Sequence, residues 1–480
     1  MFTEVTATHL FCGPDRGLLE NVVLRHDNGI ITSISDGVVP PPTRRTFIIP
    51  AFVNAHDHAR PTASSFGAVN MPLESWIIRS AFGTPPDPYL AAASSLARSA
   101  RAGCGAMMIH YTRPSGAMTL VEEAKAIARA AADVGLRIGF ALAVRDQNPI
   151  VYGDSSPILS SLSADDRKTV EDLFVKPATP PRDYIELTEA IASAIAGPKT
   201  DVQFGPAGMQ WCSRPLLEAI AENSTLTGRR IHMHLLETVY QRAWADEHFP
   251  NGIVHYLRDI GFLSKRLTLA HCIHARLDEL EIIAESGARI VTNFSSNLHL
   301  HSGLAPIAAA HKCGCAIAVG VDGLALDEDD DVIREMRLVQ MAHGGLGFKR
   351  TWTRSGFFDL AIRNGRETTG APGTGALAPG SPADFVVIDL DRLDRDRIMP
   401  VDPLELLFAR GNASLVRDVI VDGRTIVREG KPTGVDLPAI EEELRGLYRN
   451  NIGQFGRLEQ AWSPLSASLH NWFEAQLTCW

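Results

Sequence analysis

The sequence predicts an α/β fold: a (β/α)8 TIM barrel with a small β-sandwich domain built from both chain ends. Eight apolar, β-branched runs alternate with stretches of helical period across the middle of the chain. The runs are almost continuously apolar, which is typical of parallel strands that helices cover on both faces. Short strands separated by turn residues occur at both ends of the chain, so the two ends can build one small domain together.

The predicted small domain takes strands from both ends of the chain. Its N-terminal strands are expected at Val5–Phe11, Asn21–Arg25 and Ile30–Ile34, and its C-terminal strands at Ala383–Ile388, Arg417–Val421 and Thr425–Arg428. The turns Asp27-Asn28-Gly29 and Asp422-Gly423-Arg424 predict hairpins, because Asn and Gly accept the positive φ of tight turns. The expected boundaries are 1–49 and 376–435 for this domain, 50–375 for the barrel and 436–480 for a C-terminal helical tail. Pro40, Pro41 and Pro42 are interpreted as a linker into the barrel.

The barrel itself is predicted from the alternation of strands and helices. Its strands are expected at Phe47–Val53, Gly105–Tyr111, Ile138–Val144, Val202–Ala207, Arg230–Leu235, Leu267–His271, Arg289–Phe294 and Ala316–Val321. Helices are expected at Tyr89–Arg101, Leu120–Val134, Asp183–Ile195 and Leu216–Glu222. The connections over 59–88 and 145–200 are long, and loops of this kind shape specificity in barrels. Rim candidates are Trp76, Phe82, Tyr111, Arg145, Gln147, Gln210 and Trp211.

Composition excludes several classes of protein. The 480 residues include 46 Lys+Arg and 56 Asp+Glu, and the net charge of −10 argues against a nucleic-acid partner bound through its phosphates. The 7 cysteines are scattered and form no C-x-x-C pair, which favours free thiols in a reducing compartment. No run reaches the ~18 apolar residues of a membrane span, and the N-terminus has no secretory pattern. We therefore expect a cytoplasmic protein that has no membrane partner.

Polar side chains follow four of the predicted strands, at the barrel rim where chemistry takes place. His56 and His58 are two residues apart after the first strand, so they project to the same side. The fifth strand ends in His232, His234 and Glu237, the sixth in His271 and the eighth in Asp322. Each feature alone is also compatible with a polar strand end or a helix cap. Four such ends at one rim predict a metal site, and the ligand set His56, His58, His234 and Asp322 suits Zn²⁺ or Fe²⁺.

In this order the motifs resemble the amidohydrolase superfamily, in particular its mononuclear metal-dependent deaminase and chlorohydrolase branch. That branch includes cytosine deaminase-like, adenosylhomocysteine deaminase-like and triazine hydrolase-like enzymes. The segments that carry the resemblance are Pro50–His58, His232–Glu237 as H-x-H-x-x-E, Ala270–Cys272, Ser296–Leu298, Val321–Asp322 and Gly380–Ile388. It spans nearly the whole chain.

The resemblance implies a metal-dependent hydrolase with one divalent metal ion, Zn²⁺ more than Fe²⁺, held by His56, His58, His234 and Asp322. Metal-activated water would attack an sp² carbon of an aminated nitrogen heterocycle of purine, pterin, pyrimidine or triazine type, and ammonia would leave. Glu237 and His271 would manage protons, and Asp322 would also relay one to the leaving amine. The partners implied are a small heterocyclic substrate, water and further copies of the chain in a homodimer or higher homo-oligomer.

Alternatives stay open at this point. The same site can remove another leaving group or hydrolyse a cyclic amide, and a relative without turnover can bind metal or ligand only. The dinuclear branch resembles the first motif too, but it needs a carboxylated lysine at the end of strand four, and Val202–Met209 contains none. Candidate substrate-binding residues are Arg60, Asn297, His274, His301 and Gln210. Asp57, between the first two histidines, is interpreted as a residue that orients a ligand or as a surface acid.

Overall fold

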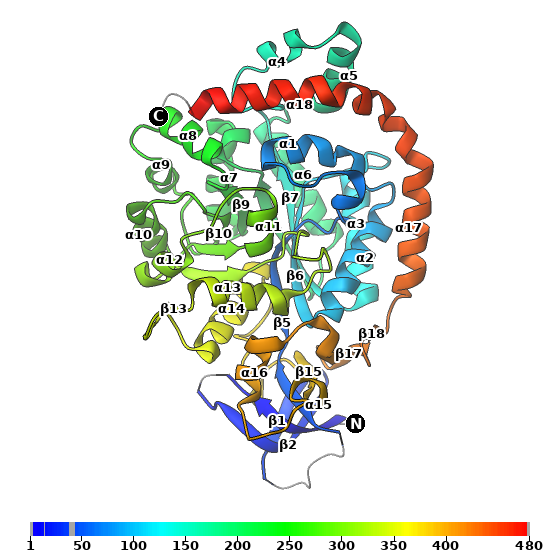
Figure 1. The fold of residues 1–480 in the computed structure, drawn as a ribbon, viewed down its shortest axis with the longest axis vertical. Coiled ribbons are helices and arrows are strands. Elements are labelled where there is room, and N and C mark those ends of the chain that lie inside the picture. Colours follow the sequence, from blue (N-terminus) through cyan, green and yellow to red (C-terminus); the bar gives the residue numbers. More distant parts are fainter. Residues whose placement is uncertain (1–2, 14, 38–43, 478–480) are drawn as a thin grey trace.

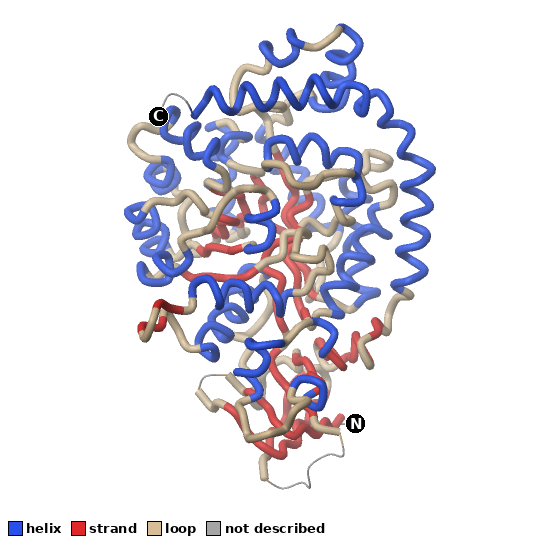
Figure 2. The backbone as a smooth tube through the Cα atoms, viewed as in Figure 1, coloured by secondary structure: helices blue, strands red, loops and turns tan. Residues whose placement is uncertain are grey.

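The computed structural model describes residues 3–13, 15–37 and 44–477 (Figure 1). Eight parallel strands form the predicted barrel, and helices surround them (Figure 2). In spatial order these are β5 (Phe52–Asp57), β6 (Cys104–Tyr111), β7 (Arg137–Val144), β8 (Thr200–Pro206), β9 (Ile231–Leu235), β10 (Leu267–His271), β11 (Arg289–Thr292) and β12 (Ala316–Val319). The segment after β12 returns to β5, where the Asp322 amide donates to the His56 carbonyl at 2.9 Å. A Cβ at Gly320 would lie 2.7 Å from the His56 nitrogen, so only glycine permits this approach.

The helices that cover the barrel begin and end on recognisable sequence signals. The covering helices are α2 (Pro88–Arg101), α3 (Leu120–Val134), α6 (Pro181–Ala194), α7 (Arg214–Thr227), α8 (Val239–His248), α9 (Ile253–Asp259), α10 (Leu277–Ser286), α11 (Phe294–His299), α12 (Ile307–Cys313), α13 (Val332–His343) and α14 (Arg354–Thr369). In α3, Thr119 and Glu122 form a capping box, and Gly135 ends the helix at φ 99°. The helices expected from the sequence lie where the periodicity placed them.

The two long connections contain further helices at the carboxyl ends of the strands. The loop after β5 carries α1 (Leu73–Arg79) and the short helix η2 (Ser80–Gly83). The loop after β7 carries α4 (Ser156–Ser161) and α5 (Ala164–Phe174) before α6 begins. A small hairpin of β13 (Gly345–Leu346) and β14 (Lys349–Arg350) lies between α13 and α14. The connections that the sequence marked as long therefore build the rim of the barrel.

The second domain is a mixed sheet that combines both ends of the chain, as predicted. Its order is β18-β17-β16-β15-β4-β1-β2-β3, in one continuous sheet. The bounds are β1 (Thr3–Phe11), β2 (Leu18–Asp27), β3 (Ile30–Ser35), β4 (Thr46–Pro50), β15 (Phe385–Asp389), β16 (Val416–Val421), β17 (Arg424–Arg428) and β18 (Lys431–Pro432). β4 joins the two halves, because it pairs in parallel with β1 and antiparallel with β15. The two short helices α15 (Leu390–Leu393) and α16 (Pro403–Arg410) follow β15.

One predicted strand is divided in the structure. The run Phe47–Val53 was expected to be the first barrel strand, but β4 lies in the small sheet and only β5 lies in the barrel. The chain passes from one sheet to the other at Ala51, whose amide donates to Asp384. Both halves of the run are fully buried, so hydrophobicity alone gives no sign of the change.

The C-terminal tail is helical and lies over the barrel. α17 (Leu437–Asn451) runs beside α2, and α18 (Gly456–Leu477) crosses the end of the barrel opposite the small sheet (Figure 1). α18 packs on α1, α4, α5 and α8, all of which follow the carboxyl ends of strands. The tail therefore covers the rim at which the sequence places the chemistry.

A buried ion pair joins the two domains, and we expect its loss to destabilise the protein. Arg366 donates to Asp384 at 2.8 Å, and Arg137 approaches the same carboxylate at 3.3 Å. Burial opposes ionisation of Asp384, but the two arginine charges outweigh it and hold its pKa below the usual value. Arg366→Met should lower the free energy of unfolding in urea by ~3 kcal/mol, because a buried carboxylate loses its main partner. The half-exposed Arg363 on the same helix is the control, and Arg363→Met should cost less than ~1 kcal/mol.

The pH dependence of that stability gives a second readout. Because the pKa of Asp384 is lowered, the pair stabilises the fold above about pH 4 and loses this contribution as the pH falls below it. Arg366→Met should therefore lose less stability on acidification than the unaltered protein. If Arg366→Met and Arg363→Met lower the free energy of unfolding by the same amount, the pair of Arg366 and Asp384 does not have the role assigned to it.

The remaining expectations from the sequence concern the cysteines, the proline linker, membrane spans, location and oligomeric state. Within the described ranges, the six cysteines Cys12, Cys104, Cys212, Cys272, Cys313 and Cys315 are free. The proline linker at 40–42 and Cys479 lie outside the described residues. In the part of the chain that is described, no helix combines the length and the apolarity needed to cross a membrane. The cytoplasmic location and the homo-oligomer stay predictions.

Candidate metal centre

Buried histidines converge at the carboxyl ends of the barrel strands. His56 and His58 lie at the end of β5, His234 in β9 and His271 at the end of β10, and all are at most 8% exposed. Ligand atoms of His56, His58 and Asp322 lie within 4.8 Å of one another, as do those of His56, His234 and His271. The two groups share His56, so the structure brings the predicted ligands and His271 to one point.

Each of these rings is held through Nδ1, which leaves Nε2 for the centre of the site. His58 and His234 donate from Nδ1 to the carbonyls of His110 (2.6 Å) and Ala207 (2.8 Å), and His271 donates from Nδ1 to Asn297 Oδ1 (2.8 Å). His56 Nδ1 shares a hydrogen bond with His232 Nε2 at 2.7 Å. A partner on one ring nitrogen fixes the tautomer and orients the other nitrogen, which is the usual arrangement around a protein-bound metal.

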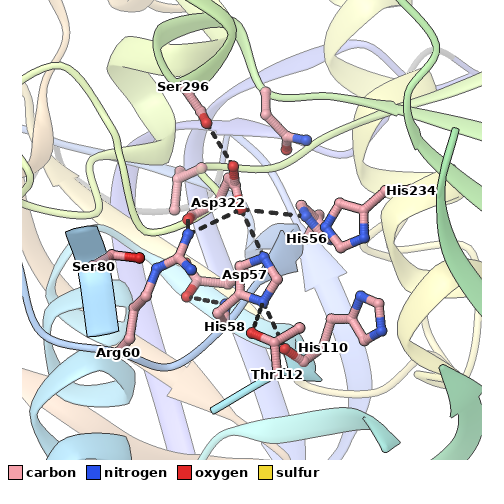
Figure 3. Close-up of polar contacts among 12 residues, drawn as sticks. His56, Asp57, His58, Arg60, Ser80, His110, Thr112, His234, Ser296 and Asp322 are labelled. Atoms are coloured by element: carbon pink, nitrogen blue, oxygen red, sulfur yellow. Dashed lines mark hydrogen bonds and ion pairs between the residues drawn. The ribbon is translucent and has the colours of Figure 1, made fainter. Parts of the chain in front are cut away.

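Asp322 supplies the carboxylate of the site. Its Oδ1 lies 2.9 Å from His58 Nε2 and 3.3 Å from His56 Nε2, and Ser296 Oγ donates to its Oδ2 at 2.5 Å. Figure 3 shows Asp322 in the middle, with His56 and His234 on one side and Arg60 on the other. The carboxylate is thus placed to share one cation with the imidazoles.

The polar atoms at the centre lack protein partners. His56 Nε2, His271 Nε2 and Asp322 Oδ1 are buried and accept or donate no hydrogen bond among the described residues. Unsatisfied buried polar atoms are costly, and here they face one another. A nitrogen- and oxygen-rich set of this kind fits a divalent cation such as zinc, which would satisfy all of them at once.

The charge states at neutral pH also suit a metal. Burial lowers the pKa of His58 and His234 well below the usual value, and it lowers the pKa of His271 to about 4. Burial opposes ionisation of Asp322, but His56 and His58 outweigh it and hold its pKa well below normal. The imidazoles of His58, His234 and His271 are therefore neutral and the carboxylate of Asp322 is charged, which is the state that coordinates a cation.

Glu237 lies beside the same centre, and its pKa is raised, whereas the pKa values described above are lowered. Burial, together with the charges of Asp322 and Glu74, raises the pKa of Glu237 well above its usual value. Its Oε2 is 3.8 Å from His271 Nε2, and the side chain is 2% exposed. A buried carboxyl group whose pKa is raised is suited to general acid–base chemistry.

The backbone at this rim is held in a rarely used conformation. Left-handed φ values between 49° and 73° occur at the non-glycine residues Ala59, Leu236, His271, Cys272 and Asp322. Such residues cost free energy and are concentrated at functional sites. Asp57 stabilises the first of these turns, because its Oδ1 accepts from the amides of His58 (2.7 Å) and Ala59 (2.8 Å). Asp57 is fully buried, so its interpretation as a surface acid is wrong.

The predicted substrate-binding residues differ in where they lie. Arg60 reaches the centre, and its Nη2 donates to the Asp322 carbonyl at 3.0 Å. Asn297 contacts the centre through His271. Gln210 is buried after β8, and its amide nitrogen has no partner among the described residues. His274 instead donates to the Ser302 carbonyl (2.9 Å), and the exposed His301 contacts Asn70 (3.2 Å).

Two further residues lie at the site although neither was predicted to act there, and His110 was interpreted as a core or rim histidine at the end of a strand. His110 is fully buried, stacks on His234 with ring centroids 4.8 Å apart, and has an Nδ1 without a partner in the described part of the chain. Its position at the end of β6 was the available signal. Glu74 on α1 accepts from Tyr152 (2.9 Å) and Thr238 (2.5 Å), and its charge acts on Glu237. No spacing rule places a loop residue such as Glu74 in the site.

The dinuclear alternative lacks its bridging residue. β8, the fourth barrel strand, contains no lysine. Lys199 precedes β8 and pairs with Asp422 of the small sheet at 3.3 Å, at the opposite end of the strand from the histidines. The geometry therefore favours one metal ion over two.

Comparison with known proteins identifies one family of hydrolases, in agreement with the geometry of the site. A model described as "Amidohydrolase family" matches residues 47–426. The 5-methylthioadenosine/S-adenosylhomocysteine deaminase of Nitratidesulfovibrio vulgaris is 28% identical over 413 residues, which cover 85% of this chain and 86% of that protein. The family match over residues 47–426 includes the segment from His56 to Asp322, which carries the metal centre.

Two solved structures share the fold. Atrazine chlorohydrolase from Arthrobacter aurescens TC1, complexed with zinc, has a TM-score of 0.76 at 21% identity and covers 92% of this chain and 98% of its own. An adenosine deaminase from Xanthomonas campestris with bound zinc has a TM-score of 0.74 at 20% identity, with 94% and 98% covered. At these identities the likeness shows a shared fold, in which a barrel is joined to a sheet built from both ends of the chain.

Proposed function

Because the chain belongs to the amidohydrolase family, whose model matches residues 47–426, we propose that it is a metal-dependent aminohydrolase. It removes the amino group of a nitrogen heterocycle of purine, pterin, pyrimidine or triazine type and releases ammonia. The observation that carries the proposal is the convergence of bare imidazole nitrogens and a carboxylate beside Glu237. The names of the relatives, which include deaminases of adenosine derivatives, support this class of substrate.

One divalent cation, zinc more than iron, is held by His56, His58, His234 and Asp322. The zinc bound in two structural neighbours supports this choice of metal. When bound, the cation supplies Lewis-acid chemistry, which makes water a nucleophile at neutral pH. The protein contributes the dry, shaped pocket and the fixed ring orientations described above.

Protons are handled by Glu237 and His271. Glu237 keeps a proton on its buried carboxyl group and passes it to the ring nitrogen of the substrate as the carbon beside it becomes tetrahedral. His271 Nε2, left bare because Nδ1–H donates to Asn297, accepts a hydrogen bond from the attacking water. Asp322 accepts a proton from the attacking water and passes it to the leaving amine, which departs as ammonia. Arg60 and Asn297 lie close enough to position the heterocycle.

The experiment that tests this function is ammonia release across a panel of aminated purines, pterins, pyrimidines and triazines, with metal analysis of the same sample. We expect about one equivalent of metal per chain and ammonia from at least one class of the panel. Full metal occupancy without turnover of any amine would count against the proposal.

His232 is proposed to support the metal through His56, and its loss should weaken metal binding. His56 donates from Nδ1 to His232 Nε2 at 2.7 Å, so His232→Leu leaves a buried donor without an acceptor. Partners of this type change metal affinity by ~10–100-fold. The dissociation constant, measured by competition with a chelator, should rise within that range, and His232→Gln should restore part of the affinity. His248 on α8 is half-exposed and serves as the control in His248→Leu; an unchanged constant for His232→Leu would refute the role.

A further inference from the structure

We propose that Glu335 on α13 is a positioning residue, whose buried carboxyl group fixes the start of α11 and, through α11, the orientation of Asp322 and His271. The inference rests on the proposed function, because it takes from there the roles of Asp322 as a metal ligand and of His271 in proton handling. It makes one of the covering helices a requirement for metal binding and for turnover.

The short helix α11 is the element that reaches both groups. Ser296 Oγ donates to Asp322 Oδ2 at 2.5 Å (Figure 3), and the next residue, Asn297, accepts with its Oδ1 from His271 Nδ1 at 2.8 Å. Two consecutive residues of one helical turn therefore orient the carboxylate and an imidazole of the centre. A shift of this turn would disturb the metal ligand and the proton-handling histidine together.

The start of α11 is held by another helix and not by its own cap. The N-cap residue is Asn293, whose side chain forms no capping hydrogen bond and places its amide nitrogen 3.4 Å from His271 Nδ1. The first amides of a helix need acceptors from elsewhere when the cap supplies none. Glu335 supplies one, because its Oε2 accepts from the Ser295 amide at 3.0 Å and its Oε1 accepts from the Ser295 hydroxyl. The carboxyl group thus grips the residue directly before Ser296.

The position of Glu335 is a costly one for an acidic side chain. Glu335 is fully buried, and in the described part of the chain no cation forms an ion pair with it. Arg334, its neighbour in the sequence, pairs instead with Asp327 and Asp329. Burial raises the pKa of Glu335 to about 7, although the hydrogen bonds from Ser295 oppose this rise. An apolar side chain would be cheaper to bury here, so the contact with α11 favours a role in the site.

The test begins with Glu335→Leu in the full chain, which removes the acceptors of Ser295 and keeps the bulk of the side chain. We measure the metal dissociation constant by competition with a chelator, and kcat for ammonia release with the metal site saturated. The dissociation constant should rise by ~10–100-fold and kcat should fall by a similar factor, as for other partners of metal ligands. Glu335→Gln keeps one oxygen that accepts from Ser295, so it should bring both values back to within about tenfold of the unaltered protein.

Glu123 on α3 is a matched control, because it makes the same kind of contact elsewhere. It is fully buried and accepts from the amide (3.1 Å) and the hydroxyl (2.5 Å) of Ser115, in a loop after β6 that carries none of the proposed metal ligands. Glu123→Leu should lower the free energy of unfolding in urea, as Glu335→Leu does, but leave the metal dissociation constant and kcat unchanged. A purely structural role for Glu335 predicts the same pattern for both variants.

Double variants show whether Glu335 acts through α11. Glu335→Leu and Ser296→Ala remove the same support of Asp322, so the variant with both changes should raise the metal dissociation constant no further than the larger single effect. Glu335→Leu combined with Asn297→Leu should behave in the same way for kcat. If Glu335→Leu does not fold, Ser295→Ala takes its place in both comparisons, because it removes one of the two hydrogen bonds to the carboxyl group.

The outcomes separate this inference from the proposed function, because metal affinity is measured without a substrate. An unchanged dissociation constant and kcat in Glu335→Leu, or effects that multiply in both double variants, overturn the positioning role and leave the deaminase intact. Loss of stability alone, as expected for Glu123→Leu, overturns it as well. Coupled losses of metal affinity, without ammonia from any compound, support the positioning role and count against deamination.

Discussion

Glu237→Gln should retain the metal and lose turnover by ~10²–10⁴-fold, the usual contribution of a positioned acid–base group. Glutamine keeps the size and the hydrogen-bonding capacity of the side chain but cannot carry the proton. Burial and the charges of Asp322 and Glu74 raise the pKa of Glu237, which favours the protonated carboxyl group in the unaltered protein. The measurement is kcat/KM for ammonia release, with the metal content of the same preparation.

A matched control distinguishes chemistry from a general effect of charge. Glu247 on α8 has a side chain that is 73% exposed, and Glu247→Gln should keep the full rate. If Glu237→Gln retains the rate with metal in place, the carboxyl group is not the proton carrier. If it loses the metal as well, Glu237 acts on the cation and its assigned role is wrong.

The prediction for Glu237, and the one for the metal ligand Asp322 given below, depend on features that the sequence alone could supply. The apolar runs predicted seven of the barrel strands closely, because strands of a closed parallel barrel are buried on both faces. The run Phe47–Val53 overlaps the remaining strand, β5, only at Phe52 and Val53. The ligand set followed from the rule that carboxyl ends of parallel strands meet at one rim. His56, His58, His234, His271 and Asp322 all lie there, as that rule requires.

The same reasoning failed where local geometry departs from a regular strand. Alternation of side chains assumes extended backbone, but His271 and Cys272 have φ of 73° and 49°. His274 therefore turns to the Ser302 carbonyl. His301, itself at φ 55°, contacts Asn70 at the surface instead of a pocket. Residues just beyond a strand end cannot be placed by spacing when the chain turns through the left-handed region.

Long loops set a second limit. Glu74 reaches the site because α1, which packs against α18, folds back over the rim. Trp76 on the same helix was expected at the rim, but Glu74 was not. Neither hydrophobic period nor motif spacing encodes that tertiary contact. Because loops of this kind shape specificity in barrels, the chemistry could be predicted from the sequence more closely than the substrate.

Asp322→Ala should release the metal. The substitution removes the carboxylate whose Oδ1 lies 2.9 Å from His58 Nε2 and 3.3 Å from His56 Nε2, and it removes the negative charge that balances the cation. A ligand that contacts the metal should matter more than the ~10–100-fold typical of an outer partner. After exhaustive dialysis, elemental analysis should find the metal-to-protein ratio far below that of the unaltered protein.

Ser296→Ala is the matched control for this prediction. Ser296 donates to the other carboxylate oxygen at 2.5 Å, so its loss disturbs the orientation of Asp322 without removing a ligand. Metal content should stay near one equivalent, with affinity reduced by no more than ~100-fold. Stoichiometric metal in Asp322→Ala after dialysis would remove Asp322 from the ligand set. The three histidines would then have to hold the cation without a carboxylate, and the unpartnered Oδ1 would need another explanation.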